Sequence, residues 1–344
     1  MTPPRLAGID IARGLALIGM FIAHAAPYPD PDAEWIVDGR SSLLFATLAG
    51  VSLGLMSGSA EPTAGRGRMR QTVVLRALLL ILLGLVLWIV PTDIAIILDY
   101  YGVMFLLLVP LLFLPRRVLA IVAVTLFVIA PLLADAAQPI VDSATTPALV
   151  VVPVEWLLTG YYPALVWLPV LILGLIAARS DLRRVGTQLL VLLGGIGGML
   201  VGYGAAAVVL GVDASAHSAT HAEILGSGGF AFTVIGALLL LTGPALGAIG
   251  RGIRFALAPV GAMGSMPLTI YAGQILVIAS FFIAAGRPFV VYDSWALVAW
   301  LIIGSALFAL LWRRFVGPGP LEWVMRQLTS PPSLATDRTP TTTT

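Results

Sequence analysis

Long apolar runs, each of a length that suits a membrane-spanning helix, follow one another along almost the whole chain. Of the 344 residues, 59% are hydrophobic and only 10% are charged, which leaves too few polar groups to cover a surface in water. A run of about 20 apolar residues is long enough to cross a membrane as a helix. The runs in this chain predict an all-α, polytopic membrane bundle of about ten transmembrane helices. The expected spans are 8–26, 41–58, 73–91, 95–114, 118–136, 161–178, 186–210, 227–249, 267–285 and 294–312.

The arginines predict how this bundle is oriented. Most of them fall on one set of alternate connections, whereas the opposite connections hold only Arg40 and Arg287 and carry several acids. Because cytoplasmic loops are enriched in basic residues, both termini are expected in the cytoplasm of a multi-pass protein of a bacterial inner or plasma membrane. The arginines form short separated clusters, so no nucleic-acid partner is expected. The cytoplasmic set is Arg5, Arg66, Arg68, Arg70, Arg116, Arg117, Arg179, Arg183, Arg184, Arg251, Arg254, Arg313 and Arg314.

The two ends of the chain have their own signals. A basic residue, an apolar run and the small residues around His24 imitate a cleaved signal peptide, but Asp10 and Arg13 interrupt the supposed apolar core. At the other end, threonine and proline dominate from Thr329 onward. We therefore expect a transmembrane domain over 1–328 and a disordered tail over 329–344.

Glycines at four-residue spacing occur within the seventh expected span, at Gly194, Gly198 and Gly202. Small residues on one face of a helix let a neighbouring backbone approach closely. This stripe therefore predicts a tight contact between two helices.

Arg13 and His24 stand eleven residues apart in the first span, with an apolar stretch between them. At about 100° per residue, they share one helix face to within roughly 20°, together with Asp10, and lie about 16 Å apart. Ionisable groups at membrane depth are costly and often mark a working site. The simpler alternatives are an arginine that reaches the inner boundary beside Asp10, and an interfacial histidine.

Further polar residues lie at the opposite face of the predicted membrane. His217, His221 and Glu223 fall in the outer connection 211–226, so all three histidines, His24 included, are at or beyond one membrane face. A zinc site would need a third protein ligand, which the spacing does not supply, so no metal is expected. Asp99, about four residues inside its span, either orients an imidazole or is an interfacial acid bound to a hydroxyl. The long outer connections 27–40 and 137–160 complete a region where a substrate could bind.

Short motifs then occur in a characteristic order along the chain. They are RLAGIDIARG at 5–14, GRSSLLF at 39–45, LAG at 48–50, DYYG at 99–102, GYYP at 160–163, HS at 217–218, GSGG at 226–229, PLTIY at 267–271 and GPLEW at 319–323. This ordered set resembles the YeiB-like and heparan-alpha-glucosaminide N-acetyltransferase-like membrane proteins. The spacing of Arg13 and His24 is also similar to that of the acyltransferase-three enzymes, which suggests the wider transmembrane acyltransferase superfamily.

The resemblance implies an enzyme that transfers an acyl group from cytoplasmic acyl-CoA to an extracytoplasmic glycan or lipid-linked sugar. An imidazole suits the removal of a proton from the acceptor, so His24 is expected as the base, with Asp99 and His217 as further catalytic residues. The animal acetyltransferase carries an essential histidine in its first outer loop, whereas residues 25–40 contain none. Direct transfer and transfer through a covalent acyl-histidine are therefore both left open.

The donor's phosphates need cationic partners, and a guanidinium offers a fork of donors for them. We expect Arg13 to bind acyl-CoA, with Asp10 and Arg40 completing that site. Membrane lipids are the other expected partners, and a homodimer is left open.

Two other classes of function stay open. The same charges at membrane depth would serve a proton-coupled transporter or a lipid or glycan flippase. A sensor or scaffold without turnover is the third class, and no supporting domain is recognised for it.

The expected orientation is tested by labelling sealed cells with a thiol reagent that does not cross membranes, since the chain has no cysteine of its own. Asp32→Cys and Ser215→Cys should react from outside, because both fall in outer connections. Gly67→Cys should stay unlabelled until the cells are opened. Reaction at Gly67 in sealed cells would reverse the assignment.

Overall fold

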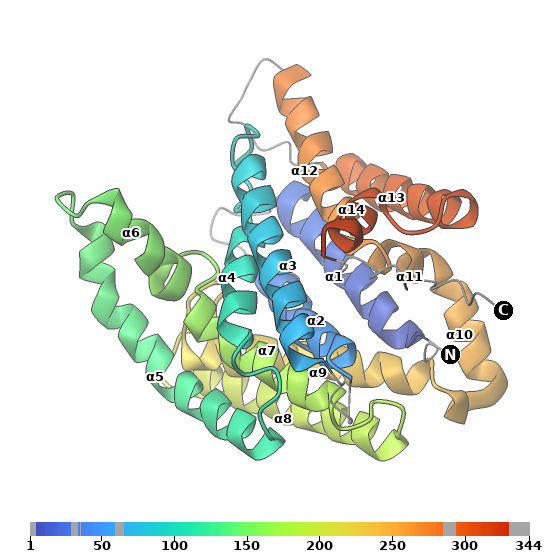
Figure 1. Ribbon diagram of the computed structural model, residues 1–344, viewed down its shortest axis with the longest axis horizontal. Coiled ribbons are helices and arrows are strands. Elements are labelled where there is room, and N and C mark those ends of the chain that lie inside the picture. Colours follow the sequence, from blue (N-terminus) through green and yellow to red (C-terminus); the bar gives the residue numbers. More distant parts are fainter. Residues whose placement is uncertain (1–4, 29–33, 35, 59–64, 285–293, 330–344) are drawn as a thin grey trace, which may run out of the picture.

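The computed structural model describes residues 5–28, 34, 36–58, 65–284 and 294–329, and in this part of the chain every regular element is a helix (Figure 1). The all-α fold class is therefore confirmed. The elements are α1 (Ala7–Ala25), α2 (Arg40–Met56), α3 (Arg66–Leu87), α4 (Leu98–Leu108), α5 (Arg116–Asp142), α6 (Ala148–Val154), η1 (Glu155–Thr159), α7 (Ala164–Ala178), α8 (Val185–Val208), α9 (His221–Leu241), η2 (Pro244–Leu246), α10 (Gly247–Ala256), α11 (Ala258–Gly264), α12 (Pro267–Ala284), α13 (Trp295–Phe315) and α14 (Pro320–Thr329).

Helix α1 lies inside the bundle, where it packs against α2, α9, α11, α12 and α13. Its apolar side chains are buried on more than one face; Ile11, Leu17 and Phe21, for example, are at most 2% exposed. A segment in contact with five other helices is an integral element of the fold.

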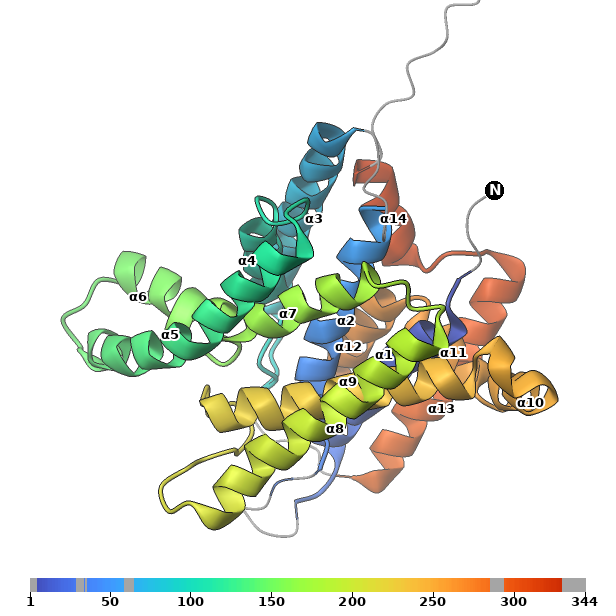
Figure 2. The same ribbon diagram turned by 90° about the horizontal axis from the view of Figure 1, so that it is seen from below.

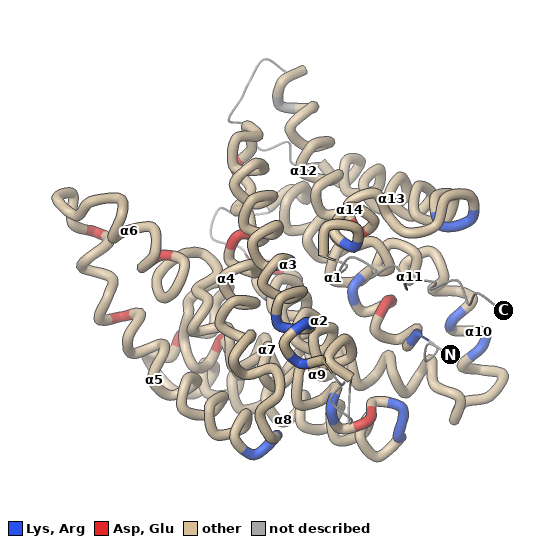
Figure 3. Tube along the Cα trace, in the orientation of Figure 1, with Lys and Arg blue, Asp and Glu red and all other residues tan. Residues whose placement is uncertain are grey.

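The outer helices turn apolar side chains away from the protein. Leu82 in α3, Ile121 in α5, Leu190 in α8 and Trp300 in α13 are each more than half exposed. Figure 3 shows the same helices as long stretches without charge, with arginines mainly near helix ends. Such surfaces are costly in water and are satisfied by lipid, so the chain is a multi-pass membrane protein.

Among the described helices, fewer are long and apolar enough to cross a membrane than the sequence predicts. Six are long and apolar enough to cross a membrane, and the number becomes eight if each of two bent pairs, α6–η1 with α7 and α11 with α12, is one span. The two remaining predicted spans coincide with α2 and α4, which have 17 and 11 residues. At 1.5 Å per residue α4 is only about 16 Å long, half the hydrocarbon thickness. The count of ten, and the placement of both termini in the cytoplasm, stay predictions.

Two predicted boundaries are wrong. The connection 137–160 is largely helical, because α5 continues to Asp142 and is followed by α6 and a π-helical turn. The span predicted at 227–249 begins six residues earlier, where Thr220 caps the backbone N–H of Glu223, and ends at Leu241 before the Gly243-Pro244 break.

The C-terminal end of the described chain is anchored. Thr329 is the last residue of α14, is 3% exposed and accepts a hydrogen bond from Arg76 Nε at 3.4 Å. The remainder of the predicted disordered tail, 330–344, lies outside the described residues.

Helices α8 and α9 run side by side, as Figure 2 shows. A Cβ atom at Gly195 would lie 2.7 Å from the Gly229 carbonyl oxygen, whereas one at Gly194 would meet nothing within 4 Å. The contact face of α8 therefore contains Gly195, Gly198 and Gly202, and Gly194 is not part of it, because the helix turns by 3.6 residues rather than four.

Gly195→Ala should therefore destabilise the protein, while Gly194→Ala should leave its stability unchanged or slightly raised. Both variants gain the same helix propensity, about 1 kcal/mol, so the difference between them reports the lost contact with α9. Thermal unfolding in detergent measures it. Equal midpoints for the two variants would contradict the observed packing.

Candidate active site

A cavity of about 380 Å³ lies at the end of the bundle where α1 finishes. Segments far apart in the sequence meet around it: the end of α1, the stretch before α2, the stretch before α4, and the turns that precede α7 and α9. We call this the outer cavity. The polar residues that line it are His24, Tyr28, Glu34, Asp38, Ser41, Ser42, Asp93, Tyr161, Tyr162 and His217.

His24 occupies the last turn of α1 and lines the outer cavity. Its Nδ1 lies 3.1 Å from Nε2 of Gln274, a residue of α12 that is 2% exposed. The Oε1 atom of Gln274 is buried and has no hydrogen-bond partner among the described residues. A glutamine 250 positions away in sequence thus orients the His24 ring.

His217 reaches the same cavity from the turn before α9. Its Nδ1 lies 3.1 Å from the carbonyl oxygen of Tyr161, and its ring centroid lies 4.0 Å from that of Tyr161 and 5.9 Å from that of Trp167, which it stacks on. Burial among these rings lowers the pKa of His217 to about 4, although the bond to the Tyr161 carbonyl partly opposes that shift. His217 is therefore neutral at physiological pH.

Glu223 holds the backbone that presents His217. Its fully buried carboxylate accepts hydrogen bonds from the backbone N–H groups of His217 and Ala219, both at 2.8 Å. Those two residues adopt φ angles of +61° and +56°, which are unfavourable for residues with a side chain. The carboxylate stabilises this strained turn, and so fixes the ring of His217.

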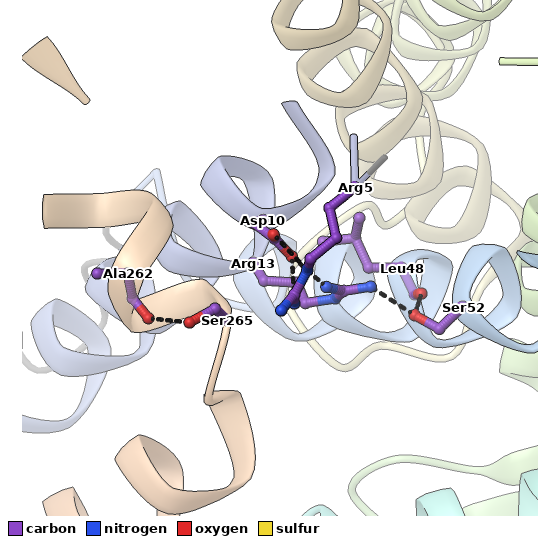
Figure 4. A network of polar contacts seen from close by, with 7 residues as sticks. All are labelled: Arg5, Asp10, Arg13, Leu48, Ser52, Ala262 and Ser265. Carbon is purple, nitrogen blue, oxygen red and sulfur yellow. Dashed lines mark hydrogen bonds and ion pairs between the residues drawn. The ribbon is translucent and has the colours of Figure 1, made fainter. Parts of the chain in front are cut away.

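A polar network surrounds Arg13, twelve residues before the end of α1 (Figure 4). Arg13 donates to Asp10 at 2.7 Å and to the hydroxyl of Ser52 in α2 at 2.9 Å. Arg5 also pairs with Asp10, at 3.1 Å. The pairing of Arg13 with Asp10, which belongs to the simpler alternative of an arginine at the inner boundary, is thus present, and the network leaves one net positive charge.

Arg13 lines a second cavity, of about 230 Å³, which we call the inner cavity. Arg76, Tyr101, Tyr271 and Glu322 lie on its wall as well. A neighbouring cavity of about 340 Å³ shares Arg76 with the inner cavity and is also lined by Arg5, Arg313 and Arg326. This end of the bundle is therefore strongly basic.

Tyr101 stands between the two cavities. Its ring lines the inner cavity and stacks on Phe45, at 5.8 Å between centroids, while its hydroxyl donates to the carbonyl oxygen of Ser42. Ser42 lines the outer cavity. One aromatic side chain with its backbone partner thus forms part of the wall between them.

Three other residues singled out from the sequence lie elsewhere. Asp99 is fully buried in the first turn of α4, where its Oδ2 accepts from Trp156 Nε1 at 2.9 Å. Arg40 donates to the hydroxyl of Tyr203 at 2.8 Å, and His221 packs against Phe127. None of the three is among the residues that line the outer or inner cavity in the described part of the chain.

Sequence reasoning did not find Gln274 or the role of Glu223. Gln274 is a lone polar residue in an otherwise apolar run, and burying such a group costs free energy unless it is bonded. A polar residue in an apolar run is therefore the sequence signal that points to Gln274. Glu223 instead stands among the polar residues of the outer connection, where nothing in the sequence distinguishes it as the partner of the His217 backbone. Tyr161 and Tyr162 also line the outer cavity.

Comparison with known proteins decides the family. Residues 5–195, more than half of the chain, match the family described as "Heparan-alpha-glucosaminide N-acetyltransferase, catalytic". The chain belongs to this family. Residues 177–331 match a second family, described as "Protein of unknown function (DUF418)". Both cavities are built mainly from residues within these two matched regions, and the resemblance drawn from the ordered motifs is confirmed.

A curated relative points the same way. The chain is 36% identical over 73 residues to "Uncharacterized protein YeiB" of Escherichia coli (strain K12). The aligned part covers 20% of this chain and 19% of YeiB. The match supports a YeiB-like member of the heparan-alpha-glucosaminide N-acetyltransferase catalytic family.

Glu223→Gln should lower the stability of the protein and displace His217. The amide would turn its NH₂ group toward one of the two backbone donors, and leaving that buried N–H without an acceptor costs about 1–3 kcal/mol. Thermal unfolding in detergent and the imidazole NMR signals of His217 measure the two effects. The control is Asp142→Asn, an exposed carboxylate bonded to Gln138. An unmoved His217 signal in Glu223→Gln would show that the carboxylate does not position the turn.

Proposed function

We propose that this chain is a membrane acyltransferase that moves an acyl group from cytoplasmic acyl-CoA to a hydroxyl or amine of an extracytoplasmic glycan or lipid-linked sugar. One observation carries the proposal. A single helix, α1, contributes Arg13 to a basic inner cavity and His24 to an outer cavity that holds a second histidine.

The inner end suits the donor. Arg13 is bonded to Asp10 and to a neutral serine hydroxyl, and a phosphate would replace that hydroxyl with a stronger, charge-assisted partner. The neighbouring arginines that line the adjoining cavity add positive charge for the remaining phosphates of a nucleotide. Acyl-CoA carries its phosphates at one end and its thioester at the other.

The outer end suits a polyhydroxylated acceptor. Carboxylates of Glu34, Asp38 and Asp93 line the outer cavity and can accept hydrogen bonds from hydroxyl or amine groups. The exposed ring of Tyr161 offers a flat apolar wall beside them. Both histidines are within this cavity, so proton transfer and acceptor binding would take place together.

The separation of the two ends matches an extended donor. Eleven residues of helix place Arg13 and His24 about 16 Å apart along the axis. A pantetheine arm passing Tyr101 would bring the thioester from the inner cavity to the outer one. In this mechanism Tyr101 moves aside or lets the arm pass beside its ring.

A transporter is the second candidate, and one observation favours it. Helices α11 and α12 form a pair bent by 88°, and broken helices of this kind line substrate sites in transporters. Purified protein incubated with several acyl-CoAs, with and without membrane glycolipid, separates the two functions. Release of free CoA with an acyl mass gained by the acceptor supports the acyltransferase, and accumulation of unmodified substrate in vesicles supports the transporter.

Arg13→Ala should raise the apparent KM for acyl-CoA about tenfold or more, because one charge-assisted bond contributes about 1.5–3 kcal/mol. Arg13→Lys should recover only part of the loss, since lysine lacks the planar fork. Arg40→Ala is the matched control, because Arg40 is bonded to Tyr203 away from the inner cavity. An unchanged donor KM in folded Arg13→Ala protein would place the phosphates elsewhere.

A further inference from the structure

The two histidines of the outer cavity differ in the bond that each Nδ1 makes. His217 Nδ1 lies against the carbonyl oxygen of Tyr161, which can only accept a hydrogen bond. His217 Nδ1 must therefore carry the proton of the neutral ring. Its Nε2 is then left with a free lone pair.

His24 has the opposite arrangement. Its Nδ1 faces the amide nitrogen of Gln274, which can only donate. His24 Nδ1 is therefore the acceptor, and the proton of the neutral ring lies on Nε2. Within the described part of the chain, Nε2 of each ring is left for a bound substrate.

We propose that His217 is the general base of the acyl transfer and that His24 is the hydrogen-bond donor to the acyl oxygen, with Gln274 as the residue that positions His24. This division of roles rests on the proposed function, and it changes the expectation that His24 removes the proton. A base needs an unprotonated nitrogen, whereas oxyanion stabilisation needs an N–H group. The two rings supply one of each.

His217 Nε2 takes the proton from the acceptor's hydroxyl or amine while that atom attacks the carbonyl carbon of the thioester. The carbonyl electron pair moves to the acyl oxygen, which accepts a hydrogen bond from His24 Nε2–H. When the tetrahedral intermediate collapses, the carbon–sulfur bond breaks, and the proton passes from His217 to the leaving CoA sulfur.

With His217 as the base, the protonation of its ring determines how the transfer activity depends on pH. A base works in its neutral form, which exists above its pKa, and burial holds the pKa of His217 at about 4. Activity should therefore persist through pH 5 to 6, below the ordinary range of a histidine at about 6.5, and fall only toward pH 4. The titratable groups that line the cavity with His217 are His24, Tyr28, Glu34, Asp38, Asp93, Tyr161 and Tyr162, and Glu223 accepts a hydrogen bond from its backbone.

The positions of the protons are measured directly by NMR of the full-length protein labelled with ¹⁵N-histidine. The chain has only three histidines, His24, His217 and His221, so each variant lacking one assigns its signals. The expected result is a proton on Nδ1 of His217 and on Nε2 of His24. Gln274→Glu should move the proton of His24 to Nδ1, because a carboxylate only accepts. A proton on His24 Nδ1 in the wild-type protein would overturn the assignment, whether or not the protein is active.

The roles are tested by paired substitutions. His24→Gln keeps an N–H group near the position of Nε2 and should retain transfer within about tenfold, whereas His24→Ala should lose about 10²- to 10³-fold. His217→Gln supplies no base and should lose about 10²- to 10⁴-fold. His221→Ala, whose ring packs on Phe127, is the control and should remain active.

The opposite pattern, with His24→Gln inactive and His217→Gln active, would overturn the division of roles while leaving the acyltransferase intact. Absence of transfer by the wild-type protein with every acyl-CoA would instead reject the proposed function. Because the NMR measurement needs no turnover, the two failures are distinguishable.

Discussion

The cost of placing charge at membrane depth governs this structure. Five other helices surround α1, so that Asp10, Arg13 and His24 face protein and cavities rather than lipid. The ion pair of Arg13 with Asp10 and the bond of His24 to Gln274 satisfy these groups internally. The apolar outer helices then need only lipid as a partner.

The same arrangement produces two chemically different ends. The inner cavity and its neighbour collect arginines, whereas the outer cavity collects carboxylates, aromatic rings and two histidines. A single rigid helix keeps the two ends at a constant separation. An enzyme that receives its donor from one compartment and its acceptor from another needs such a separation, and family membership agrees with transferase chemistry.

The turn around His217 shows how strain is placed at a site and compensated. Two residues with positive φ are held by one buried carboxylate, and the ring is held by the Tyr161 carbonyl and three aromatic neighbours. Strained backbone persists only where its surroundings over-determine it. Here the result is a fixed tautomer in a cavity wall, which a mobile loop would not provide.

Local hydrophobicity and helix geometry are enough to predict the all-helical class, the place of nearly every long helix and the spacing of Arg13 and His24. The ordered motifs of the sequence also indicate the family. The contacts of Gln274 with His24, of Tyr161 with His217 and of Asp99 with Trp156 depend instead on how the helices pack. These contacts join residues 56 or more positions apart, and no local pattern records which polar group will satisfy another across a packed bundle.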